Sequence, residues 1–188
     1  MKVFILDLDN FDSKTLEKLI KEDINVFKYK AELKRNQHIA GRFLLKFAAE
    51  KFYGITDTSI TYDAKKPIFK NSPLHFSISH SRNMIAVVIA QKPVGIDIEY
   101  NLADRDFVSI LERCDIAFES NIEKMNVDLQ KKMFYESWTK YEAKIKLNAK
   151  TDVFYSTVYP VKHFTLSVAY KEPFFIEELI NCNDILTI

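Results

Sequence analysis

The sequence predicts an α+β fold in which long helices pack against antiparallel sheets, and two patterns carry this prediction. Apolar and polar residues alternate over short runs such as Lys2–Leu8 and Val94–Tyr100, which is typical of β-strands. In two longer segments, Ala31–Tyr53 and Leu129–Leu147, apolar residues recur every three or four positions, which indicates amphipathic helices. Hydrophobic residues make up 47% of the 188 residues, enough to fill one sizeable core or two small ones.

The expected elements follow in the order strand, helix, hairpin, strand, helix and further strands. Asp12 or Ser13 can cap a short helix after the first strand, and Gly54 stands where the long helix should end. Arg82-Asn83 joins two alternating runs into a hairpin, while residues 101–126 favour short helices and loops. The expected strands are Lys2–Leu8, Ile24–Tyr29, Leu74–Ser81, Met84–Ala90, Val94–Tyr100, Phe154–Val158, His163–Tyr170 and Phe174–Ile180. The expected core faces of the long helices are Ile39, Phe43 and Phe47 on the first and Phe134, Trp138, Tyr141 and Ile145 on the second.

Two of the alternating strands have similar sequences, HFSISHS at 75–81 and HFTLSVAY at 163–170. This likeness suits two similar α/β subdomains with antiparallel sheets, related by a pseudo-twofold axis. Chance similarity between two alternating strands is a comparably good explanation. On the first interpretation, the N-terminal subdomain comprises residues 1–100 and the C-terminal subdomain residues 101–188.

Composition restricts the possible partners and location of the protein. The net charge of +1 does not favour nucleic-acid binding. The sequence contains no run of about 18 apolar residues, so it predicts no membrane span. Cys114 and Cys182 are the only cysteines and lack metal-type spacing, which fits a reducing compartment. We therefore expect a cytoplasmic protein that acts on neither nucleic acid nor membranes.

The stretch VGIDIEY, residues 94–100, places two carboxylates beside a core strand. Val94, Ile96 and Ile98 share one face, and Asp97 and Glu99 share the other. Like charges this close repel, and Mg²⁺, which takes oxygen ligands, would relieve the repulsion. For a D-x-E pair alone, a solvent-facing side of an antiparallel strand is the commoner explanation.

Two further segments carry groups that can bind anions or metal. Glu142 precedes Lys146 by four residues, so the two can form a helix salt bridge, or can instead supply a third carboxylate and a phosphate contact. Ser79 and His80 in SISHS can bind a phosphate or a ribose, or can hydrogen-bond the following turn. A Ser–His hydrolase is disfavoured, because adjacent residues point to opposite faces of a strand.

Cationic residues gather at two places, in Lys65-Lys66-Pro67 and along one face of the first long helix. A solvated helix face is the default explanation, and phosphate binding is the alternative. The chain has three glycines and no G-x-G-x-x-G or P-loop motif, so a backbone phosphate cradle is not expected. The cationic helix face consists of Arg35, His38, Arg42 and Lys46.

Taken together and in this order, the motifs resemble those of the 4′-phosphopantetheinyl transferases of the Sfp (surfactin-synthetase-activating) type. The resemblance spans residues 35–147 and implies the fold of that family, with coenzyme A between two subdomains. It implies a Mg²⁺-dependent holo-acyl-carrier-protein synthase, which transfers 4′-phosphopantetheine from coenzyme A to a serine of an apo acyl or peptidyl carrier protein and releases 3′,5′-ADP. Two-halved members are monomeric, so a monomer is expected. The motifs are AGRFLLK (40–46), KKP (65–67), FSISHS (76–81), GIDIE (95–99) and WTKYEAKIK (138–146).

The resemblance also implies a role for each candidate residue. The implied metal ligands are Asp97, Glu99 and Glu142, and the implied catalytic residues are Asp97, Glu142 and Lys146. Either Glu142 or a metal-held water would serve as the base for the attacking serine. The implied coenzyme A contacts are Arg35, His38 and Arg42 at the 3′-phosphate end, Lys66, Ser79 and His80 at the adenosine phosphates, and Lys146 at the pyrophosphate.

The sequence departs from the family pattern at two positions. Tyr141 stands where the family has a lysine just before the glutamate, and Lys140 or Lys144 could replace that cation. Lys65 stands in place of the usual glycine before Lys-Pro. Tyr141 is the one hint of an alternative, a non-catalytic relative that binds coenzyme A or a carrier protein. A metal-dependent nucleotide phosphohydrolase is a further alternative, although the sequence offers no second metal site.

Overall fold

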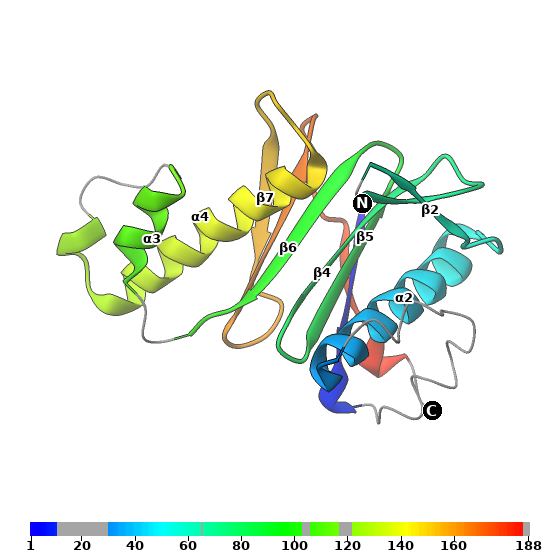
Figure 1. Ribbon diagram of the computed structural model, residues 1–188, viewed down its shortest axis with the longest axis horizontal. Coiled ribbons are helices and arrows are strands. Elements are labelled where there is room, and N and C mark those ends of the chain that lie inside the picture. Colours follow the sequence, from blue (N-terminus) through cyan, green and yellow to red (C-terminus); the bar gives the residue numbers. More distant parts are fainter. Residues whose placement is uncertain (11–29, 65, 103–105, 117–121, 186–188) are drawn as a thin grey trace.

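The computed structural model describes residues 1–10, 30–64, 66–102, 106–116 and 122–185, and within these ranges the chain has a mixed α+β fold. Long helices pack on antiparallel sheets, as the sequence predicts, except that one strand pair of the first sheet is parallel (Figure 1). The short helix and the strand expected within 12–29 lie outside the described residues. None of the helices in the described part of the chain has the length and apolar character needed to span a bilayer.

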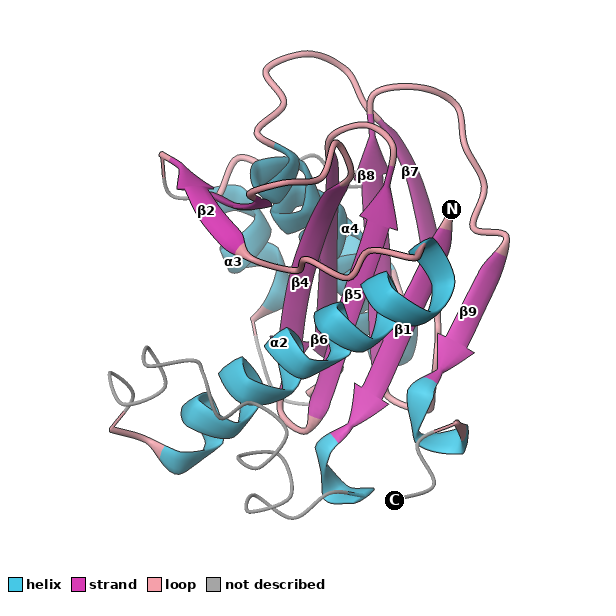
Figure 2. Cartoon of the chain, turned by 90° about the vertical axis from the view of Figure 1, so that its right-hand side faces the viewer, coloured by secondary structure: helices cyan, strands magenta, loops and turns pink. Residues whose placement is uncertain are grey.

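The first sheet is four-stranded and is covered on one face by a long helix. Helix α2 (Glu32–Tyr53) crosses this sheet (Figure 2) and ends where Gly54 takes a left-handed conformation, with φ of 65°. The N-terminal strand pairs antiparallel with the hairpin and parallel with the last strand. The strand order is β4 (His75–Ser81), β5 (Met84–Ala90), β1 (Lys2–Asp7) and β9 (Glu178–Asn181).

The second sheet is three-stranded and carries the other long helix. Its order is β6 (Val94–Tyr100), β8 (Phe164–Tyr170) and β7 (Phe154–Val158), all antiparallel. Helix α4 (Val127–Leu147) lies along β6 (Figure 1), capped by the side chain of Asn126. The short elements are η1 (Leu8–Asn10), β2 (Ile60–Asp63), β3 (Lys66–Phe69), α3 (Phe107–Arg113), η3 (Ile122–Lys124) and η4 (Cys182–Asp184).

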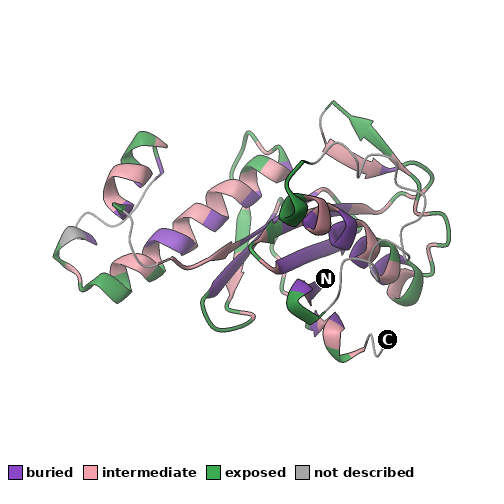
Figure 3. Cartoon of the chain, turned by 60° about the horizontal axis from the view of Figure 1, so that its bottom comes forward, coloured by how far each residue is buried: buried purple, intermediate pink, exposed green. Residues whose placement is uncertain are grey.

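The core of the described residues consists of four clusters, and buried residues follow the central strands (Figure 3). One cluster joins α2 to the first sheet, a second joins the two sheets, a third joins α3 to α4, and a fourth joins α4 to the second sheet. The cluster between the two sheets contains Val94, Ile96 and Ile98, so the predicted core face of β6 is confirmed.

The structure differs from the predicted core face of α4 in one respect. Phe134 is buried, and Trp138 and Tyr141 pack beside it against α3, but Ile145 is 53% exposed. The prediction was wrong for Ile145 because the last turns of α4 contact the sheet through Ala143 and Leu147 instead. The periodicity of the sequence predicts the apolar stripe of a helix, but the neighbouring elements determine which residues of that stripe are buried.

The sheets do not divide at residue 100. Strand β6 precedes that position yet belongs to the second sheet, and β9 follows it yet pairs with β1. Strand β9 is also shorter than the expected run from Phe174 to Ile180. The division into subdomains at residues 1–100 and 101–188 stays a prediction.

Candidate active site

The two sheets meet edge to edge at β4 and β6, and serine side chains bridge them in place of a backbone ladder. We call these two strands and their bridging serines the β4–β6 seam. Each serine hydroxyl accepts a backbone N–H that would otherwise lack a partner at the sheet edge. The bonds run from Ile96 to Ser77, from Ile98 to Ser79 and from Tyr100 to Ser81, at 3.1, 3.2 and 3.0 Å.

Asp97 lies at the centre of this seam and is 4% exposed, so the solvent-facing explanation is wrong for this carboxylate. Its Oδ1 atom accepts hydrogen bonds from Ser79 Oγ at 2.8 Å and from Lys146 Nζ at 2.7 Å. Among the described residues, its Oδ2 atom is buried without a hydrogen-bond partner. Because a buried polar atom without a partner is costly, this oxygen suits a cation or a ligand donor.

Lys146 forms its ion pair across the helix–sheet interface with Asp97, at 2.7 Å. The ammonium also donates to Ser79 Oγ at 2.8 Å. Glu142 is one turn earlier on α4, and its pKa is raised, first by burial and then by the charge of Asp97, while Lys146 lowers it. The carboxylates of Glu142 and Asp97 therefore repel each other in a partly dry site.

The third predicted metal ligand, Glu99, also lies on the seam, where its Oε2 atom accepts from Ser81 Oγ at 2.8 Å. Within the described ranges, no three His, Cys, Asp or Glu side chains are gathered closely enough to form a metal site. The orphaned oxygen of Asp97 and its repulsion with Glu142 nevertheless fit a hard divalent cation. The metal roles of Asp97, Glu99 and Glu142 stay predictions.

Gly95 allows α4 to approach the strand that carries Asp97. A Cβ atom at this position would lie 1.9 Å from the carbonyl oxygen of Ala143 and 2.7 Å from the backbone nitrogen of Leu147. Ala143 and Leu147 directly follow Glu142 and Lys146 on α4. The sequence analysis assigned no role to Gly95. The available signal was its position, since Gly95, Asp97 and Glu99 alternate along the strand and therefore share one side of it.

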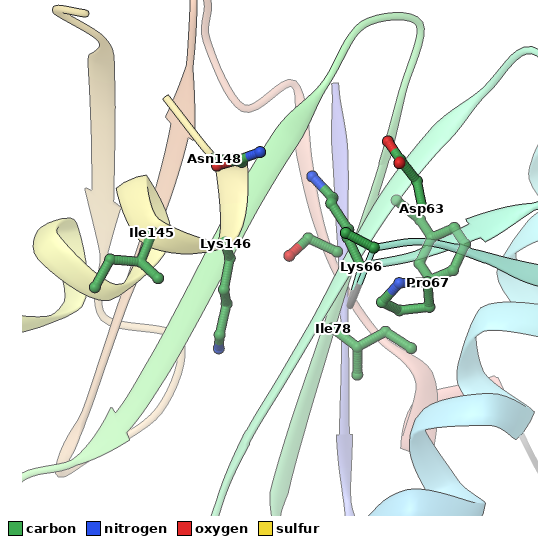
Figure 4. Close-up of a pocket in the computed structure, with 10 residues that line it drawn as sticks. Asp63, Lys66, Pro67, Ile78, Ile145, Lys146 and Asn148 are labelled. Atoms are coloured by element: carbon green, nitrogen blue, oxygen red, sulfur yellow. The ribbon is translucent and has the colours of Figure 1, made fainter. Parts of the chain in front are cut away.

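A cavity of about 500 Å³ adjoins this cluster between the β2–β3 hairpin, β4 and the C-terminal end of α4. Figure 4 shows Lys66 and Lys146 approaching it from β3 and α4 respectively. Lys66 Nζ donates to the carbonyl of Val94 at 3.2 Å, and burial lowers the pKa of Lys66, opposed by Asp63. Sequence reasoning missed the lining residues Asp63, Pro67, Ile78, Ile145 and Asn148, because they come from four separate elements.

The predicted histidines belong to the same electrostatic neighbourhood. Partial burial lowers the pKa of His80, and the Lys146 ammonium and His38 lower it further, whereas Asp97 raises it. His38 comes from α2, so the structure brings residues of α2, β4, β6 and α4 together. Arg35 and Arg42 lie half-buried on α2, and their contact with a ligand stays a prediction.

Tyr141, which stands where the family pattern has a lysine, and the neighbouring Lys140 both make contacts within the protein. The ring of Tyr141 lies 6.1 Å from the ring of Trp138 in the cluster between α3 and α4. Lys140 Nζ lies 3.9 Å from Glu136 Oε2. Tyr141 therefore serves packing, and Lys140 is paired along its own helix.

Similarity to proteins of known name is consistent with these motifs, although no family model matches the chain. A 4′-phosphopantetheinyl transferase of Bacillus subtilis is 32% identical over 117 residues, which cover 60% of this chain and 51% of that protein. The 4′-phosphopantetheinyl transferase psf-1 of Bacillus pumilus is 27% identical over 164 residues, covering 80% and 70%. The 4′-phosphopantetheinyl transferase HetI of Nostoc sp. is 31% identical over 121 residues, covering 60% and 51%. The chain thus spans about half the length of the first and third of these relatives.

Proposed function

We propose that this chain, which is a homologue of the 4′-phosphopantetheinyl transferases, transfers 4′-phosphopantetheine from coenzyme A to a serine of an apo carrier protein. The observation that carries the proposal is the position of Lys146, which lines the 500 Å³ cavity and also pairs with Asp97. A ligand in the cavity would therefore meet a cation and the predicted metal carboxylates at the same point.

The cavity has the size and lining of a small-molecule site, with apolar walls and two cations. Pro67, Ile78 and Ile145 provide apolar surface for a base or sugar, while Lys66 and Lys146 would bind phosphate oxygens. Lys146 is held in place by Asp97 and Ser79, so its charge is already oriented before a ligand binds.

Asp97, Glu99 and Glu142 would hold Mg²⁺, which when bound supplies positive charge at the phosphate oxygens. The serine oxygen of the carrier attacks the phosphorus of the phosphopantetheine half, and the bond from this phosphorus to the bridging oxygen breaks. The leaving group is 3′,5′-ADP. Glu142, one helical turn before Lys146, is the candidate base on this chain.

Mass spectrometry of carrier proteins tests the proposal directly. The chain is incubated with coenzyme A, Mg²⁺ and apo carriers from fatty-acid, polyketide and peptide synthesis, and the mass of each carrier is then measured. We expect a gain of one phosphopantetheine on at least one carrier, together with release of 3′,5′-ADP. Asp97→Ala and Glu142→Ala should abolish the gain while the far-ultraviolet circular dichroism is kept. No gain on any carrier would favour a non-catalytic binding relative.

A further inference from the structure

The three serines of the seam repeat one hydrogen-bonding pattern, but their partners on β6 differ at each step. Ser77, Ser79 and Ser81 each accept a backbone N–H from β6. Ser79 also donates to Asp97 Oδ1, and Ser81 donates to Glu99 Oε2, both at 2.8 Å. The residue in the corresponding position beside Ser77 is Gly95, which has no side chain. The pattern therefore contains two serines that hold a carboxylate and one that does not.

The hydrogen-bonding capacity of Ser79 is fully used inside the protein. A serine hydroxyl has one hydrogen to donate and two lone pairs to accept with. Ser79 donates to Asp97 and accepts from the N–H of Ile98 and the ammonium of Lys146, and the residue is 4% exposed. These bonds tie Ser79 to β6 and α4, and its contact with coenzyme A stays a prediction.

We propose that Ser79 and Ser81 are positioning residues that orient the carboxylates of Asp97 and Glu99 toward a hard divalent cation. A hydrogen bond to one oxygen fixes the plane of a carboxylate, whose terminal torsion is otherwise broad. In Asp97 the bonded oxygen is Oδ1, and the remaining oxygen, Oδ2, is buried without a partner among the described residues. The seam thus presents an oriented oxygen, which is the type of ligand that Mg²⁺ takes.

The inference rests on the metal part of the proposed function but not on group transfer. Its test is the affinity for Mn²⁺, a paramagnetic substitute for Mg²⁺, measured by electron paramagnetic resonance with and without coenzyme A. Ser79→Ala and Ser81→Ala should bind Mn²⁺ about 10- to 100-fold more weakly than the wild type, as is typical when a partner of a metal ligand is removed.

Ser77→Ala is the matched control. It removes the same kind of seam bond, from Ile96 N to Ser77 Oγ at 3.1 Å, and leaves both carboxylate bonds in place. Ser77 also lines the 500 Å³ cavity, so the control is read without coenzyme A. In that condition its affinity for Mn²⁺ should match that of the wild type, although its melting temperature falls with those of the other two variants. Ser81→Thr keeps a hydroxyl at the half-buried end of β4 and should restore the affinity that Ser81→Ala loses.

Several results would overturn the inference. These are an equal loss of affinity in all three alanine variants, no loss in Ser79→Ala and Ser81→Ala, or a wild-type chain that binds no Mn²⁺ in either condition. If Ser79→Ala does not fold, the comparison of Ser81→Ala with Ser77→Ala decides the question. A wild type that shows the serine-dependent Mn²⁺ affinity but transfers nothing would refute the proposed function and leave the inference standing.

Discussion

Replacing Gly95 by alanine should push helix α4 away from strand β6 and separate Lys146 from Asp97. The added Cβ would lie 1.9 Å from the carbonyl oxygen of Ala143, and real Cβ contacts almost never fall below 3.0 Å. The helix must therefore move by about 1 Å, because the obstruction is backbone and cannot rotate away. Such overpacking costs about 1–3 kcal/mol, which lowers the melting temperature of a chain of this size by roughly 2–12 °C.

The same displacement should reduce transfer more than stability alone explains. The ion pair between Lys146 and Asp97 is 2.7 Å long, and a misplacement of about 1 Å can reduce a catalysed rate on the order of 100-fold. The assay is steady-state transfer of phosphopantetheine to a carrier protein, measured well below the melting temperature of the variant. Wild-type kcat/KM in Gly95→Ala would refute this account of how the glycine places α4.

Gly54→Ala is the matched control, because it makes the same glycine-to-alanine change at the end of α2 and not on β6. Gly54 has φ of 65° with no atom within 4 Å of an added Cβ, so the substitution introduces backbone strain of about 1–2 kcal/mol without a clash. It should lower the melting temperature and leave kcat/KM unchanged, because it lies at the end of α2. Equal losses of activity in the two variants would indicate that reduced stability, and not the position of α4, is responsible.

Three further predictions concern the site and the thiols. Lys146→Gln should lower the free energy of unfolding in urea by about 1–3 kcal/mol, because the buried carboxylate of Asp97 loses its counter-ion; unchanged stability would contradict the pairing. Ile145→Glu should raise the Kd for coenzyme A in calorimetry, since a negative charge would enter the cavity wall, and an unchanged Kd would place coenzyme A elsewhere. Burial raises the pKa of Cys182 to about 12, so a thiol reagent at neutral pH should label Cys114 first and Cys182 only after unfolding.

Local patterns in the sequence predicted most of the described helices and strands. The alternation of residues over 94–100 predicted β6 and its core face. The recurrence of apolar residues every three or four positions predicted α2, and Gly54 marked its end. These patterns succeed because side-chain direction along a strand or helix follows from backbone geometry within a few residues. The same periodicity gave the wrong environment for Ile145, because burial also depends on which layer covers each turn.

Pairing between distant strands could not be predicted in this way. Strand β9 joins β1 in parallel, and β6 leaves the hairpin that precedes it to join β8. Such choices depend on contacts between segments up to 176 residues apart, as in the bond from Asn183 to Asp7. A regular alternation of residues is compatible with many partners, and packing of the whole chain selects one.

The sequence by itself determined that Asp97 and Glu99 leave β6 on the same side and that Glu142 and Lys146 share a helix face, since both facts follow from period alone. Only the tertiary structure decided that Lys146 reaches Asp97, that Ser79 and Ser81 each hold a carboxylate, and that one oxygen of Asp97 is left without a partner among the described residues. The physical reason is that these contacts cross the edges of two sheets, where β4 and β6 meet through side chains and no local rule sets the partner.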